Sequence, residues 1–177
     1  PRPGMIPRCL RFNQIIGCDL CDAVIAGRHH WFLNVVCWGT GYQQAVFLSE
    51  SRTSKHVIQC FQDLWFKHYG FPELVIVDQG PEFEGSPFQD YLGNRGILCH
   101  IIDGQSPWQN GRTERAGGLL KEQLLKVVAD TACTDDADAQ TTRTERVDAR
   151  LRFVNRRGYC AQQRAFGYSH RMPAFFL

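Results

Sequence analysis

The sequence has no run of about 18 apolar residues, which excludes a helix that spans a membrane. Its first residues, PRPGMIPRCLRFNQ, also lack the apolar stretch of a secretory signal peptide, and the chain contains no internal repeats. Since 44% of the 177 residues are hydrophobic and 21% are charged, disorder is excluded as the main state, as are collagen-like and disulfide-dense folds. We expect one domain with a short appendage. Because the chain opens without Met and ends in PAFFL, we expect it to be part of a longer protein.

The eight cysteines do not follow the spacing of a zinc site or of a disulfide framework. Only Cys18-x-x-Cys21 has a metal-like spacing, and no second pair of Cys or His matches it. Other cysteines, among them Cys37 and Cys99, lie inside apolar runs and are typical of small buried side chains. We therefore expect reduced thiols and an intracellular protein.

The charge is nearly balanced overall, at +2, but it is uneven along the chain. Between Arg143 and Arg171 the only acids are Glu145 and Asp148, which leaves an excess of six positive charges. The arginines of this stretch are at positions 143, 146, 150, 152, 156, 157, 164 and 171. The stretch could contact phosphates, or it could be a solvated helix face and tail, and charge alone leaves both interpretations open.

The pattern of apolar residues predicts an α/β fold. Strands are expected at 12–18, 31–38, 43–49, 73–78 and 97–102, and helices from 51 or 53 to 68, at 87–94, at 112–129 and, more weakly, at 138–156. The tail from 158 to 177 is expected to be irregular. Two antiparallel connections followed by crossover helices indicate a mixed sheet of five strands flanked by helices.

Three carboxylates are candidates for one site. Asp19 and Asp78 are expected to end neighbouring strands, and Glu114, 36 positions after Asp78, is expected in the first turn of the long helix. Converging carboxylates repel one another unless cations lie between them, and a pair of Mg²⁺ ions is a known solution in phosphodiester chemistry. The spacing alone is weak evidence. Asp78 could simply end a strand, Glu114 could stabilise a helix N-terminus, and Asp19 could be a surface acid.

Two segments make the site hypothesis more specific. VDQGPEF (77–83) and SPWQNGRTER (106–115), with Asp19 about 60 residues upstream, resemble the catalytic core of retroviral and LTR-retrotransposon integrases. The resemblance covers about residues 10–130 and continues more faintly through 153–167. It implies a ribonuclease-H-like fold and DNA strand transfer. It also implies a linker at 1–11 from an upstream module, a catalytic core at 12–130, and a basic extension at 131–177.

The resemblance assigns roles to particular residues. Asp19, Asp78 and Glu114 would hold two Mg²⁺ or Mn²⁺ ions, with Asp22 as the alternative first ligand. DNA would be contacted by the loop before the long helix and by the helix itself, through Gln109, Asn110, Arg112, Arg115 and Lys121. The alternative is that Gln109 and Asn110 are turn residues and that Lys121 is a solvated surface side chain.

Two glycines inside the predicted catalytic helix depart from the family pattern. Gly117 and Gly118 are poor helix formers, and position 118 is where relatives often carry a second DNA-contacting Lys. The leading hypothesis is an active integrase core with DNA ends and target DNA as partners, a homodimer or higher oligomer that works in the nucleus. The alternatives are a catalytically inactive, integrase-derived nucleic-acid-binding module, and a ribonuclease H or bacterial-type transposase of the same fold.

Overall fold

A computed structural model describes residues 11–25, 27–48, 52–102, 110–131, 144–145, 147–149, 151–152, 155–156 and 158–168. The strands are β1 (Ile15–Ile25), β2 (Arg28–Cys37), β3 (Gln43–Leu48), β4 (Leu74–Val77), β5 (Leu98–Ile101), β6 (Asn155–Arg156) and β7 (Tyr159–Cys160). The helices are α1 (Ser54–Phe61), the π-helical segment η1 (Gln62–Phe66), α2 (Lys67–Tyr69), α3 (Pro81–Glu84), α4 (Ser86–Gly93), α5 (Gly111–Thr131) and α7 (Ala161–Phe166). No helix in the described ranges has the length and apolar character needed to cross a membrane.

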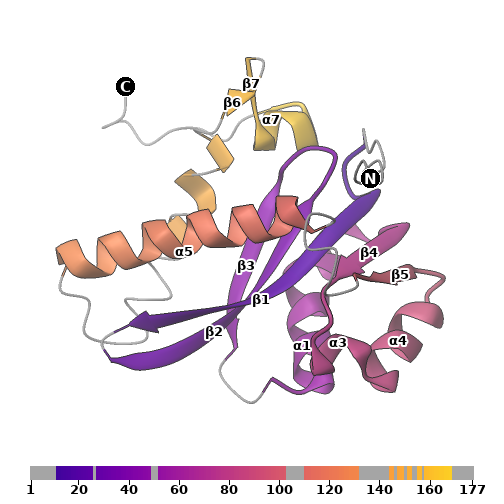
Figure 1. Cartoon of the computed structure of the whole chain (residues 1–177). Helices are drawn as coiled ribbons and strands as arrows, with labels where there is room; N and C mark the ends of the chain where they lie inside the picture. Colours follow the sequence, from indigo (N-terminus) through magenta and orange to yellow (C-terminus); the bar gives the residue numbers. More distant parts are fainter. Residues whose placement is uncertain are drawn as a thin grey trace, which may run out of the picture.

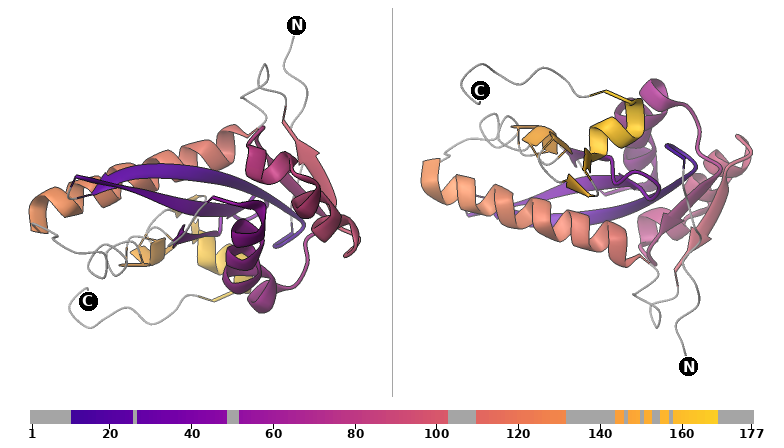
Figure 2. Two further views of the ribbon diagram at one scale, coloured as in Figure 1. Left: turned by 90° about the horizontal axis from the view of Figure 1, so that it is seen from below. Right: turned by 90° about the horizontal axis from the view of Figure 1, so that it is seen from above.

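The main sheet has five strands in the order β3-β2-β1-β4-β5. The pairs β1–β2 and β2–β3 are antiparallel, whereas β1–β4 and β4–β5 are parallel. α5 lies along β1 on one face of this sheet, and α1 and α7 lie on the other face (Figures 1 and 2). This arrangement confirms the predicted mixed five-stranded sheet with flanking helices, which is the ribonuclease-H-like fold.

β1 is longer than its apolar run predicts. The expected strand at 12–18 would have ended just before Asp19, but β1 continues to Ile25, and the prediction that Asp19 ends it is wrong. The reason is pairing: β2 remains hydrogen-bonded to β1 as far as the pair Ile25–Arg28, whereas β4 pairs with β1 only up to Gly17. Beyond the parallel part, β1 therefore continues as one strand of an antiparallel sheet with β2 and β3, and in the described residues its last three residues, 23–25, pair with β2 alone.

The helix that follows β3 begins where the sequence indicates and contains one unexpected feature. Thr53 is its N-cap, and its hydroxyl accepts a hydrogen bond from the backbone N–H of His56 at 3.4 Å. Val57, Phe61 and Trp65 are buried on its inner face, as their spacing predicts. Residues 62–66 are wound as a π-helix, which apolar periodicity does not reveal.

The described residues after 143 pack on the same core as the sheet. Val147, Leu151 and Ala161 belong to the main apolar cluster, and the Arg164 guanidinium donates a 2.6 Å hydrogen bond to the Gly39 carbonyl. The expectation of an irregular tail is wrong for residues 158–168, because β7 leads into α7, where Cys160 forms a capping box. The predicted boundary at 130 between a core and an extension stays a prediction.

Candidate active site

Asp78 is placed by the strand before it. β4 ends at Val77, and the last parallel pair between β1 and β4 is Gly17–Ile76, so Asp19 and Asp78 each lie two residues beyond this last parallel pair, although Asp19 is still paired with Asn34 of β2. Burial raises the pKa of Asp78 to about 6, with further contributions from the charges of Asp19, Glu82 and Glu114. Its Oδ1 atom is buried and has no hydrogen-bond partner in the described part of the chain. A buried, unpaired carboxylate oxygen is a costly feature that a bound cation would relieve.

Asp19 and Glu114 interact with Asp78 through their charges. Burial raises the pKa of Asp19, whereas a hydrogen bond that the Cys21 thiol donates to its Oδ2 at 3.5 Å acts in the opposite direction. Glu114 is in the first turn of α5, and partial desolvation raises the pKa of its carboxyl group, followed by the negative charge of Asp19. The three predicted acids therefore share one electrostatic environment at the same edge of the sheet.

These three acids have the chemistry that a hard divalent cation requires. They offer only oxygen ligands, and their mutual repulsion favours a positive charge between them. Within the described ranges, no group of three or more His, Cys, Asp or Glu side chains is arranged closely enough to hold a metal ion. Metal ligation by Asp19, Asp78 and Glu114 consequently stays a prediction.

Close helix–sheet contact sets the position of α5 over β1. A side chain at Gly17 would overlap the Thr113 hydroxyl, and a Cβ at Gly117 would lie 2.6 Å from the Cys21 Sγ atom. Gly117 therefore has a packing reason for being in the helix. Gly118 has none, because a Cβ there would meet nothing within 4 Å.

Lys121 of α5 and Asp22 of β1 form an ion pair. The Lys121 Nζ atom lies 3.1 Å from Asp22 Oδ1, and this hydrogen bond, together with the positive charge of the lysine, lowers the pKa of Asp22. Asp22 is thus already paired with a lysine, whereas Asp19 accepts a hydrogen bond from the Cys21 thiol, and the choice between them as a metal ligand stays a prediction. Lys121 thus reaches the Cys21–Asp22 part of β1, and its position on the face of Glu114 stays a prediction.

The other predicted DNA contacts have different environments. Asn110 is 1% exposed, its carbonyl accepts from the N–H groups of Thr113 and Glu114, and its side-chain amide has no hydrogen-bond partner among the described residues. Arg112 donates from Nη1 to the Trp38 carbonyl at 2.8 Å, and Arg115 is exposed. Gln109 lies outside the described residues. The roles of these residues in DNA binding stay predictions.

Two described arginines of the basic stretch are engaged within the protein. Arg152 pairs with Asp148 at 2.7 Å, and Arg164 is bonded to the Gly39 carbonyl. The side chains of the remaining six arginines are outside the described residues. The guanidinium groups of Arg152 and Arg164 thus have partners within the protein. These two residues give no support to a phosphate-binding role for the stretch.

Several residues near the acids could not be identified from the sequence. Glu82 is 7% exposed, and its charge contributes to the raised pKa of Asp78. Its position in the DQGPEF segment was the only signal available. Asn34 and Gln43 are fully buried amides that contact α5. In the sequence, a polar amide within or beside an apolar run looks the same whether it is buried or exposed, so their burial could not be predicted.

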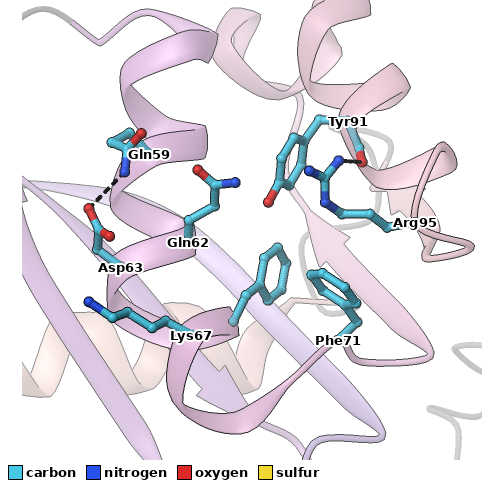
Figure 3. Close-up of a pocket in the computed structure, with 8 residues that line it drawn as sticks. Gln59, Gln62, Asp63, Lys67, Phe71, Tyr91 and Arg95 are labelled. Atoms are coloured by element: carbon cyan, nitrogen blue, oxygen red, sulfur yellow. Dashed lines mark hydrogen bonds between the residues drawn. The ribbon is translucent and has the colours of Figure 1, made fainter.

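A surface pocket of about 340 Å³ lies away from this edge, beside α4 and the helical segment from α1 to α2 (Figure 3). Arg95 stacks over the Tyr91 ring at 3.7 Å and donates to the Tyr91 carbonyl, and Gln59 donates to Asp63. The lining residues are Gln59, Gln62, Asp63, Phe66, Lys67, Phe71, Tyr91 and Arg95. None of the three predicted acids lines this pocket, so its shape says nothing about the candidate active site.

Comparison with known proteins relates this fold to integrase cores. No protein-family model matches the chain. Over 126 residues, or 71% of the chain, it is 27% identical to the Intracisternal A-particle Pol-related polyprotein of a mouse intracisternal A-particle, and the match covers 14% of that protein. The chain therefore spans a small part of the length of this curated relative.

Solved structures show the same fold over most of the chain. An integrase assembly, the simian T-cell lymphotropic virus intasome in complex with PP2A regulatory subunit B56 gamma, matches 97% of this chain and 60% of its own, with a TM-score of 0.81 and 21% identity. The HTLV-2 integrase catalytic core domain in complex with magnesium, in its dimeric form, matches 88% of this chain and 98% of its own, with a TM-score of 0.73 and 20% identity. The chain has the fold of retroviral integrase catalytic cores.

Proposed function

We propose that this chain is the polynucleotidyl transferase core of a retroelement integrase, which processes DNA 3′ ends and joins them to target DNA. The observation that carries the proposal is the proximity of Asp19, Asp78 and Glu114: burial raises the pKa of all three, and the charge of Asp19 raises the pKa values of Asp78 and Glu114 further. Clustered acids with raised pKa values are typical of functional sites. The similarity to a Pol-related polyprotein and to integrase core structures supports the same assignment.

Asp19, Asp78 and Glu114 would hold two Mg²⁺ or Mn²⁺ ions. When bound, such ions lower the pKa of an attacking water or 3′-hydroxyl and stabilise the leaving oxygen of an in-line displacement. The Cys21 thiol orients Asp19 through its hydrogen bond to Oδ2, and Asp78 contributes the buried Oδ1 atom. The structural neighbour solved with magnesium supports the use of a divalent cation.

DNA is the proposed partner, bound through phosphate contacts near the first turns of α5. Arg115 is exposed there, and Lys121 lies on the side of α5 that faces β1, where it pairs with Asp22. The functional form is proposed to be a homodimer or higher oligomer acting in the nucleus. The dimeric HTLV-2 core and the simian virus intasome support an oligomeric assembly.

A strand-joining assay with a labelled DNA end tests this function. The full chain should join the end to target DNA in Mn²⁺ or Mg²⁺, and Asp78→Asn or Glu114→Gln should abolish joining. Circular dichroism should show unchanged folding of both variants. Joining that survives in both variants at the wild-type rate would contradict the assignment of these acids.

A non-catalytic nucleic-acid-binding module is the second candidate. It is favoured by the arrangement of the acids, since within the described ranges no group of three or more His, Cys, Asp or Glu side chains lies closely enough to hold a metal ion. The same assay separates the two candidates. A wild-type protein that binds DNA with metal-independent affinity and never joins it would support the second.

A further inference from the structure

Two carboxamide side chains are buried between the sheet and α5. Asn34 in β2 and Gln43 in β3 are both 0% exposed, and the Gln43 Nε2 atom donates a 2.7 Å hydrogen bond to Asn34 Oδ1. We refer to these two residues as the amide pair. They lie on adjacent antiparallel strands, and their hydrogen bonds to α5 place both side chains on the face of the sheet that α5 covers.

The amide pair reaches two backbone carbonyls of α5. Asn34 Nδ2 donates to the Thr113 carbonyl at 3.1 Å, and Gln43 Nε2 donates to the Ala116 carbonyl at 3.2 Å. These two carbonyls lie on either side of Glu114 in the chain. Both belong to residues inside the helix, where main-chain N–H groups four residues on already pair with them. The helix therefore forms without these side-chain bonds.

Stability does not explain the amide pair. The Gln43 Oε1 atom is buried with no hydrogen-bond partner among the described residues, and such an atom destabilises a fold. Apolar side chains of similar size would fill the same space without that cost. Directional hydrogen bonds, in contrast with apolar contacts, define where along its axis a helix lies.

We propose that Asn34 and Gln43 are positioning residues that fix the axial position of α5, and with it the Glu114 carboxylate, relative to Asp19 and Asp78. The inference rests on the proposed function, since it assigns Glu114 to the reaction. It predicts that removing the amide pair slows the reaction without lowering the free energy of unfolding. A misplacement of the reacting groups by about 1 Å can cost a reaction about a hundredfold in rate.

Two variants of the full chain test this role: Gln43→Met, and Asn34→Leu combined with Gln43→Met. Gln44→Met is the matched control, because Gln44 is the neighbouring residue and donates to the Tyr42 hydroxyl instead of α5. Three quantities are measured: the melting temperature, the amide hydrogen exchange of residues 111–120, and kcat and KM for strand joining. The exchange measurement does not depend on activity.

The double variant should melt at or above the wild-type temperature, while exchange at 111–120 becomes faster. Its kcat should fall about ten- to a hundredfold with KM for DNA unchanged, and the control should match the wild type. Unchanged exchange and unchanged kcat would overturn the inference, as would a loss of activity that follows a loss of melting temperature. If the wild type itself does not join DNA, the proposed function fails, and faster exchange at an unchanged melting temperature still supports the amide pair's effect on α5.

Discussion

The raised pKa of Asp78 makes the stability of the metal-free protein depend on pH. Its folded-state pKa of about 6 exceeds the ordinary value of 3.8, so the folded protein binds a proton between these values that the unfolded chain does not bind. The contribution of Asp78 to stability therefore improves as the pH falls through 6. Above pH 6 the buried charge opposes folding.

Asp78→Asn should raise the melting temperature at pH 8 in the presence of EDTA, and the gain should shrink towards pH 4. The reason is that the substitution removes a negative charge crowded by Asp19 and Glu114. Calorimetry at pH 4, 6 and 8 measures the effect, and Asp130→Asn, at the exposed end of α5, is the control. A lower melting temperature of Asp78→Asn at pH 8 would contradict the crowding.

The two adjacent glycines of α5 should respond to alanine in opposite directions. Gly118→Ala adds a methyl group in open space and should stabilise the helix by about 1 kcal/mol. Gly117→Ala brings a Cβ to 2.6 Å from Cys21 Sγ and should destabilise the protein by about 1–3 kcal/mol. Urea unfolding of both variants measures the difference. Equal effects would show that α5 does not approach β1 as closely as described.

At the scale of elements, the contact between α5 and β1 brings a lysine and an acid together across the sheet surface. Asp22 shares the Lys121 ammonium group with any DNA phosphate that binds there, so the ion pair weakens the attraction between Lys121 and DNA. Such a partly exposed pair contributes little to stability, about 1 kcal/mol or less, and is easily exchanged.

Substitutions at the two positions should change DNA affinity in opposite directions. Lys121→Ala should weaken binding and reduce the slope of log affinity against log salt by about 0.9 on duplex DNA. Asp22→Asn should strengthen binding, because Lys121 is released from its partner. Fluorescence anisotropy from 50 to 200 mM salt measures both. Lys126→Ala, which breaks the exposed pair with Glu122 farther along α5, should leave affinity nearly unchanged.

The elements show which parts of the fold the sequence could reveal. The predicted helix at 112–129 is confirmed as α5 (Gly111–Thr131), because its apolar stripe and flanking turn residues carry a local signal. The length of β1 could not be predicted, since it depends on pairing with β2 and not on the apolar run of β1 itself. Glu82, Asn34 and Gln43 were missed for the same reason: their importance comes from neighbours that are distant in sequence.

At the scale of the whole molecule, the C-terminal residues complete the core. Leu151 is 4% exposed in the main cluster, so Leu151→Ala should lower the free energy of unfolding by about 2–5 kcal/mol. Leu119, 40% exposed on α5, is the matched control, and Leu119→Ala should change the free energy of unfolding only slightly. Denaturant unfolding measures both. Equal small losses would show that residues after 143 fold separately from the sheet.

The aromatic contact between Phe12 and Phe166, with ring centroids 5.1 Å apart, has a consequence for synthesis of the chain. Phe166 also packs on Tyr42 and Tyr69, so these rings are covered by a residue that is synthesised about 100 to 150 positions after them. A ribosome adds about 5–20 residues per second, so Phe166 is synthesised on the order of ten seconds after these rings. During that interval the nascent chain exposes an aromatic surface that is covered in the folded protein. Chaperones that bind exposed apolar surface would act on the chain at this stage.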